Sequence, residues 1–289
     1  MPIKKRVSSQ LHLPTPAMAG YVYLAVERDT RGMCLTDRQR FNFYPASPFP
    51  TISWIFEGEL HKVEDLDSAR VPRISEPLPR VLFAGPQSKP SASWSSGEVH
   101  AWMVSFYPDA LFHLFGLTAE VAKDEVLPLD HLLSAPLLHA LQQTNASQAC
   151  SPIQRIETAL GPVWRDLEVR NSASNVRRWL RFLANQATFT KAGRGVRQLQ
   201  RLVRDWTGQS LRDLELFSRV EEAFALSQKT GLQINWMADV AIDAGYSDQS
   251  HLGREVKRVT GFSPKLFSEL VKTDEAFWMY RLLGEYLRE

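Results

Sequence analysis

The first 107 residues carry short runs of β-branched and aromatic residues, and proline and glycine separate these runs. The runs lie at 21–27, 51–58, 80–85 and 99–107, and their composition is typical of β-strands. Within 51–58, Ile52, Trp54 and Phe56 fall on one face of a strand, with Ser53 and Ile55 on the other. This near-alternation predicts a sheet with one better-buried face. Several short strands in succession predict a small barrel or sandwich.

The pattern changes to helical spacing after Pro108. Helices are predicted at 108–117, 130–142 and 152–169, and apolar residues in the last of these recur three and four positions apart. The polar stretch 171–175 suits a linker, and the pattern from there to the end is helical. The predicted fold class is therefore α+β, with an N-terminal β-rich barrel-like or sandwich-like domain, then helices, then an all-α C-terminal unit.

The segment 191–208 combines an apolar helix face with a basic one. The apolar positions recur at helical spacing and are Val196, Leu199 and Val203. The basic face carries Arg194, Arg197, Arg201 and Arg204, with no acidic residue among them. Guanidinium groups suit phosphates and guanine edges, and the amides of Gln198 and Gln200 suit adenine. The competing interpretation is a solvated basic helix. It is the weaker hypothesis, because four arginines lie on one face.

Residues 234–264 predict two helices joined by a short turn. Gly245 suits the left-handed conformation that ends the first helix, and Ser247 or Asp248 can cap the second. The second helix would bury Leu252, Val256 and Val259. Its outward positions would be Gln249, Ser250, Gly253, Arg254 and Lys257. Such an outward face is typical of a helix that enters the major groove, and Gly253 would allow a close approach to DNA.

The charge of the chain is unevenly distributed. The net charge is +2 overall, but residues 171–272 carry 16 Lys and Arg against 10 Asp and Glu. The rest of the chain is net acidic, with 18 basic residues against 22 acidic ones. A basic segment on an acidic chain indicates a polyanionic partner for that segment, with chance clustering on a solvated face as the alternative.

These residues resemble a known family. AGYSDQSHLGREVKRVTGFSP (244–264) resembles the second helix-turn-helix of AraC/XylS-type transcription regulators, and VRQLQRLVRDWTGQSLRDL (196–214) resembles the recognition helix of their first. The resemblance covers about 175–272, and the order and separation of the two segments match the family. It implies a seven-helix unit whose two recognition helices enter successive major grooves of B-DNA. The long helix that joins them corresponds to 211–226.

The resemblance also implies roles for single residues. Gln200 and Arg201 of the first motif would face bases, as would Gln249, Ser250 and Arg254 of the second. His251 and Lys257 correspond to phosphate contacts or structural positions. The complete set of expected DNA-binding residues is Arg194, Arg197, Gln198, Gln200, Arg201, Arg204, Gln249, Ser250, His251, Gly253, Arg254 and Lys257.

Two features depart from the family pattern. The stretch 182–201 shows no clear tight turn before the first recognition helix. Val256 stands where the family usually has an aromatic residue, and it fills that core position with less volume. The first motif is therefore the degenerate one.

The chain is expected to divide into four regions. These are a β-rich sensor or regulatory region (1–107), connecting or dimerisation helices (108–174), the DNA-binding domain (175–272) and a C-terminal packing helix (273–289). The expected partner is double-stranded operator DNA, and the sequence leaves a small-molecule effector and a homodimer open. No ligand residue is identified, because core packing is the preferred role for the aromatic candidates Trp54, Phe56, Trp94 and Trp102.

An enzyme is the main competing class of protein. No two of the seven histidines lie at metal-ligand spacing, and GxSxG, P-loop and GxGxxG motifs are absent from the sequence. Two cysteines are too few for the zinc-bound cluster of the methyl-accepting proteins that share this type of DNA-binding unit. We therefore expect no catalytic residue, metal or cofactor. The alternative function is a small-molecule-binding module whose helix-turn-helix unit is vestigial and binds no DNA.

The sequence predicts a cytoplasmic protein. The basic start is followed by no apolar stretch of signal-peptide length, and no run approaches the 18 apolar residues of a membrane span. Two cysteines without a disulfide pattern fit a reducing compartment.

Overall fold

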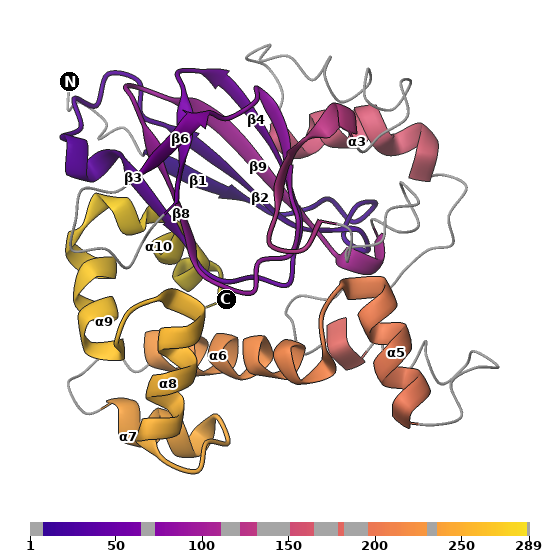
Figure 1. Cartoon of the computed structure of the whole chain (residues 1–289), viewed down its shortest axis with the longest axis vertical. Helices are drawn as coiled ribbons and strands as arrows, with labels where there is room; N and C mark the ends of the chain where they lie inside the picture. The colour runs from indigo at the N-terminus through magenta and orange to yellow at the C-terminus, as the bar shows by residue number, and fades with distance from the viewer. Residues whose placement is uncertain are drawn as a thin grey trace.

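The computed structural model of the chain describes residues 8–64, 73–110, 122–131, 151–164, 179–181, 196–229 and 236–287. Two antiparallel sheets form the N-terminal half, and helices form the C-terminal half below them (Figure 1). The predicted α+β class is therefore confirmed, including the order of β-rich region, helices and helical C-terminal unit.

The larger sheet has six strands in the order β1-β2-β9-β4-β7-β10. They are β1 (Ser9–His12), β2 (Val22–Asp29), β9 (His100–Phe106), β4 (Thr51–Glu57), β7 (Val81–Ala84) and β10 (Val126–Pro128). The smaller sheet, in the order β3-β8-β5-β6, has four. They are β3 (Phe41–Tyr44), β8 (Ser91–Ser95), β5 (Leu60–Val63) and β6 (Ile74–Pro77). The four runs predicted as strands correspond to β2, β4, β7 and β9, which are neighbours in the larger sheet.

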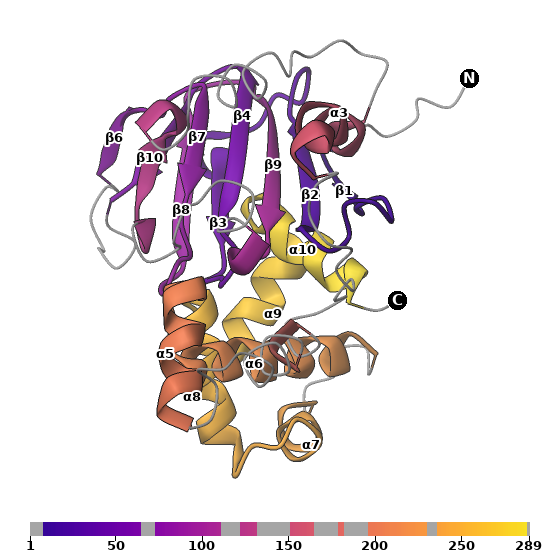
Figure 2. The same cartoon turned by 90° about the vertical axis from the view of Figure 1, so that its right-hand side faces the viewer.

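Strand β4 is buried on both faces, so the prediction of one better-buried face is wrong. Ser53 and Ile55 are 8% and 4% exposed, close to Ile52 and Trp54 at 1% and 2%. The physical reason is that the larger sheet is covered on both sides. The smaller sheet faces one side, and helix α3 (Pro152–Trp164) packs against the other (Figure 2).

The C-terminal helices are α5 (Val196–Thr207), α6 (Leu211–Lys229), α7 (Trp236–Asp243), α8 (Gln249–Thr260), α9 (Pro264–Thr273) and α10 (Trp278–Tyr286). Short 3₁₀ turns lie at η1 (Asp37–Arg40), η3 (Leu129–His131) and η4 (Glu275–Phe277). Helix α6 confirms the long helix predicted at 211–226, and it runs beneath the sheets with α5 at one end (Figure 1). Among the described helices, none is long and apolar enough to cross a membrane.

Several predicted features fall wholly or mostly outside the described residues. They are the helix at 108–117, most of the helix at 130–142, the linker at 171–175 and the entry to the first helix-turn-helix motif at 182–195.

One cluster of buried side chains joins the two halves of the molecule. It contains Ile52 and Phe106 of the larger sheet together with Phe217 and Val220 of α6 and Trp278 of α10. Helix α10 lies against β1 and β3, beside α6 and α9. The C-terminal helix therefore packs on the N-terminal half as well as on its helical neighbours, and the two halves share a core.

Candidate nucleic-acid interface

Helix α8 begins and ends at residues whose chemistry suits helix termini. The Asp248 carboxylate accepts a hydrogen bond from the backbone N–H of His251 at 2.7 Å, and this bond lowers the pKa of Asp248. In the turn before α8, Gly245 has a φ of 77°, a left-handed conformation that glycine adopts without steric cost. Gly261 ends the helix at a φ of 87°. The predicted turn, cap and stop are confirmed, with Asp248 as the cap rather than Ser247.

The two faces of α8 differ sharply in burial. Leu252, Val256 and Val259 are 0%, 6% and 6% exposed, so the predicted core face is confirmed. Leu252 and Val256 pack with α7 and the turn that follows it. The opposite face exposes Gln249, Ser250, Arg254 and Lys257. This polar face is held in place by an apolar one on the same helix.

Gly253 leaves a gap between the side chains of the polar face. It is half-buried, and a Cβ added there would meet no atom within 4 Å. A side chain would therefore fit, so the packing inside the protein does not require glycine here. The space is available to a molecule outside the protein.

His251 turns away from the polar face toward its own helix and turn. Its Nε2 lies 3.3 Å from the Glu255 carboxylate, and Ser247 Oγ lies 3.4 Å from its Nδ1. The imidazole also meets the Tyr246 ring edge-to-face, with centroids 5.2 Å apart. Of the two roles that the sequence left open for His251, these contacts favour the structural one.

Two ion pairs join α8 to α6, and we call them the α6–α8 ion pairs. Arg219 donates twice to Glu255, from Nη2 at 2.6 Å and from Nε at 3.2 Å. This hydrogen-bonded partner raises the pKa of Arg219. Arg258 Nη2 donates to Asp213 at 2.6 Å. Burial alone would raise the pKa of Asp213, but hydrogen bonds from Ser210 and Arg258 outweigh it and lower the pKa.

The pattern of residues along the sequence indicates neither of these pairs. Opposite charges are present, but the partners lie 36 and 45 positions apart along the chain. Local spacing reveals pairs three or four residues apart on one helix, and only the packing of α8 on α6 brings these four residues together.

Helix α5 presents a basic surface in its described part. Gln200, Arg201 and Arg204 are exposed, whereas Val203 is 1% exposed and faces the core. Of the remaining predicted residues of this motif, Arg194 lies outside the described residues. Arg197 and Gln198 lie on the described helix, but their side chains are outside the description. The structure therefore brings together Gln200, Arg201 and Arg204 as predicted.

A cavity of about 290 Å³ lies between the sheets and the C-terminal helices. Its walls include Leu82 and Met103 of the larger sheet, Phe217 of α6, Met279 of α10, and Val256 and Val259 of α8. The lining contains none of Trp54, Phe56, Trp94 and Trp102. Helix α8 therefore has one face toward solvent and another that forms part of the cavity wall.

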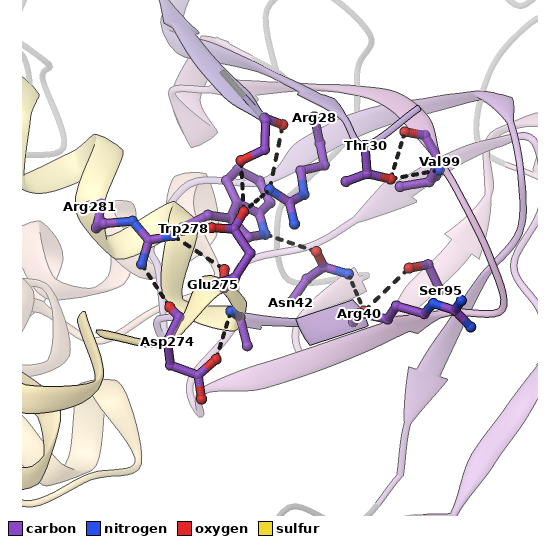
Figure 3. A network of polar contacts seen from close by, with 12 residues as sticks. Arg28, Thr30, Arg40, Asn42, Ser95, Val99, Asp274, Glu275, Trp278 and Arg281 are labelled. Carbon is purple, nitrogen blue, oxygen red and sulfur yellow. Dashed lines mark hydrogen bonds and ion pairs between the residues drawn. The ribbon is translucent and has the colours of Figure 1, made fainter. Parts of the chain in front are cut away.

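A polar network fastens η4 and α10 to the N-terminal half beside this cavity (Figure 3). Arg28, which is 5% exposed, donates to Glu275 at 2.7 Å, and Glu275 also pairs with Arg281 at 2.9 Å. Burial alone would raise the pKa of Glu275, but the bonds from Arg28 and Ser8 outweigh it and lower the pKa. The Trp278 indole N–H donates to the Asn42 side-chain oxygen at 2.8 Å.

Arg28 is a charged residue in the wall of an apolar cavity. Its Nε and Nη2 have no hydrogen-bond partner among the described residues, although its guanidinium also stacks on the Trp278 ring at 5.0 Å. Elsewhere in the described residues, no group of three or more His, Cys, Asp and Glu side chains could hold a metal ion.

Comparison with known proteins identifies the C-terminal unit. Residues 189–269 match a family model described as a helix-turn-helix domain. The predicted resemblance is thereby confirmed for this part of the chain. The domain supports a transcription regulator as the class of protein. No curated protein matches the sequence.

Solved structures with a similar arrangement include ToxT from Vibrio cholerae. One ToxT structure is 11% identical, covering 90% of this chain and 98% of that chain with a TM-score of 0.38. ToxT bound to (E)-4-(8-methylnaphthalen-1-yl)but-3-enoic acid is 10% identical, with coverages of 92% and 100% and a TM-score of 0.39. The AraC-like transcriptional activator CuxR is 11% identical, with coverages of 96% and 91% and a TM-score of 0.28.

Proposed function

We propose that the protein is a transcription regulator that binds a specific double-stranded operator, with α8 in a major groove. The outward face of α8 carries this proposal. Gln249, Ser250, Arg254 and Lys257 are all exposed on a helix whose other face is buried. Amide and guanidinium groups are the donors that match adenine and guanine edges in the major groove, and Gly253 leaves room for a base or sugar.

We further propose that α5 enters a neighbouring groove and contacts mainly phosphates. Arg201 and Arg204 are exposed there, and Arg194 and Arg197 extend the same predicted helix face. Gln198 and Gln200 are the amides of this motif that would meet bases. Phosphate contacts supply affinity without sequence preference, so α5 would anchor the protein while α8 selects the sequence.

The salt dependence of duplex binding tests this proposal. Residues 171–272 carry a net charge of +6. If about six phosphates are neutralised, the logarithm of the binding constant falls with the logarithm of salt concentration at a slope near −5. The measurement is fluorescence anisotropy with genomic duplex fragments at several salt concentrations. Absence of binding in dilute salt, or a slope near zero, would contradict it.

A second candidate function is small-molecule binding in the cavity of about 290 Å³. We propose an effector with a mostly apolar body and one hydrogen-bond acceptor, because the walls are largely apolar and Arg28 supplies unpartnered donors. Val256 and Val259 of α8 line the cavity, so such a ligand would contact the helix that we place in the groove. The alternative function, a small-molecule-binding module with a vestigial helix-turn-helix unit, requires that the protein binds such a ligand but binds no DNA.

A thermal-shift experiment tests the effector on the full chain, since the two halves share one core. A ligand that binds only the folded state raises the melting temperature with concentration. Ala101→Leu would place extra volume in the cavity wall and should abolish that rise. The surface substitution Leu13→Ala, at a residue that is 50% exposed, is the control that should preserve it. A compound library that shifts neither wild type nor control would remove the support for an effector.

A further inference from the structure

The α6–α8 ion pairs fix the orientation of α8 at two separate points. Glu255 meets Arg219, and Arg258 meets Asp213. The two partners on α8 are three residues apart along that helix. The two contacts on α6 are six residues apart, which is about 9 Å along a helix. Together with the buried side chains of Leu252 and Val256, these two contacts hold α8 at one angle to α6.

One of the two pairs also reaches the turn that follows α5. Asp213 accepts a hydrogen bond from Ser210 Oγ at 2.6 Å, and Ser210 lies between the end of α5 and the start of α6. Thr207 also holds the α5–α6 turn, because its hydroxyl accepts a hydrogen bond from the Gln209 backbone N–H at 3.2 Å. Arg258, Asp213 and Ser210 thus form a polar path from the second recognition helix to the end of the first.

The other pair neutralises an acidic residue beside the polar face of α8. Glu255 follows Arg254 directly in the sequence, and its side chain is only 12% exposed because Arg219 and His251 both contact it. Without Arg219, this carboxylate would carry an uncompensated charge close to where DNA phosphates would lie. The pair therefore sets both the angle of α8 and the charge next to Arg254.

We propose that Arg219 and Asp213 are positioning residues that set the separation and phase of the two grooves the protein can bind at once. Neither residue would touch DNA. They would hold α8 at one angle to α6, and α5 is joined to the start of α6 by a short turn. The angle between α8 and α6 would therefore determine the spacing between operator half-sites. This inference rests on the proposed function, because it has meaning only if both helices bind one duplex.

The test begins with wild-type protein and a pool of duplexes with a random core of about three helical turns. From the selected operator, a series is made in which the distance between the two half-sites changes one base pair at a time. The measured quantity is the ratio of Kd at a spacing shifted by about half a helical turn to Kd at the best spacing. We expect a clear optimum for the wild-type protein.

Arg219→Ala removes both hydrogen bonds to Glu255 and should lower this ratio by at least about tenfold, since a single charge-assisted hydrogen bond is worth that factor. The double variant with Arg219→Glu and Glu255→Arg should restore most of it, since the ion pair re-forms with exchanged partners. Arg212→Ala is the matched control, an exposed arginine of α6 for which the described residues provide no partner, and it should leave the ratio unchanged. Circular dichroism confirms that each variant is folded.

Arg219→Lys extends the test if Arg219→Ala does not fold, because lysine keeps one contact but loses the second, and the ratio should be intermediate. The inference is overturned if Arg219→Ala or Arg219→Lys weakens binding by the same factor at every spacing. It is also overturned if the wild-type protein binds duplexes without any preferred spacing, a result that leaves DNA binding itself intact. Failure of the wild-type protein to bind any duplex would instead defeat the proposed function, and this inference with it.

Discussion

The two recognition helices present different surfaces to the outside of the molecule. Helix α8 exposes a mixed polar face that consists of Gln249, Ser250, Arg254 and Lys257 and surrounds the half-buried Gly253. In its described part, α5 exposes Gln200, Arg201, Arg204 and Asp205. The surface of α8 combines amide, hydroxyl, guanidinium and ammonium groups, whereas the basic groups of the described α5 surface are two guanidinium groups.

Several features of the fold specify the position of α8. Helix α8 has a side-chain cap, a glycine stop, a buried face and two ion pairs to α6. Hydrogen bonds to base edges depend on precise placement, whereas phosphate contacts are more tolerant of it. In the function that we propose, the helix with more arginines is therefore not the one that selects the DNA sequence.

The largest expected effect comes from loosening α8 itself. Leu252→Ala removes a side chain that is 0% exposed and should cost about 2–5 kcal/mol of unfolding free energy. The affinity for the operator should fall together with the stability, because α8 loses part of its packing against α7. Urea unfolding and anisotropy measure both quantities. Ile242→Ala on α7, where the side chain is 76% exposed, is the control and should change stability by less than about 0.5 kcal/mol. An unchanged operator affinity in Leu252→Ala would show that α8 does not need this placement.

The next largest effect is expected on stability, from the contacts that hold η4 and α10 against the N-terminal half. Glu275→Gln removes the charge that faces the buried Arg28 and should cost about 1.5–3 kcal/mol of unfolding free energy at neutral pH. Because folding lowers the pKa of Glu275, its charge stabilises the fold above the unfolded-state pKa of about 4.3. That contribution is lost as the pH falls below this value.

Urea unfolding of both proteins at neutral and acidic pH measures this dependence. The stability difference between the wild type and Glu275→Gln should therefore shrink on acidification. A constant difference across that range would show that the charge of Glu275 is not what fastens the two halves.

Replacement of Arg254, the arginine that we propose contacts a base, should have a smaller and more selective effect. Arg254→Ala should cost about 1–3 kcal/mol of binding free energy on the selected operator and relax the preference at one base position. A scrambled duplex should lose far less. The measurement is a binding series on both duplexes with single-base variants of the operator. Equal weakening on both duplexes would mean that α8 contacts no bases through Arg254.

The smallest effect is expected on α5. Arg204→Ala should weaken every duplex alike by a few-fold and lower the magnitude of the salt slope by about one unit. Arg197→Ala should behave in the same way, whereas the outward position of Arg201 suits either a phosphate or a base. Binding at several salt concentrations separates these roles. A selective loss on the operator in Arg204→Ala would assign base contacts to α5 and remove the contrast between the helices.

The sequence predicted the parts of the fold whose signal is local. The strands β2, β4, β7 and β9 were found because each is a run of β-branched and aromatic residues in the buried middle of one sheet. None of the strands of the smaller sheet was predicted, and each has only four or five residues. The burial of both faces of β4 was also missed, because a single strand does not reveal what covers its second face.

The site divides in the same way. The sequence by itself determined the helix periods, the left-handed turn at Gly245, the acidic cap and the outward polar face of α8, since each depends on residues within a few positions of one another. Only the tertiary structure decided the α6–α8 ion pairs, the network around Arg28 and the cavity lined by both halves. The partners Arg219 and Glu255 are 36 positions apart and Arg28 and Glu275 are 247 apart, and packing of the shared core settles which of many possible partners meet.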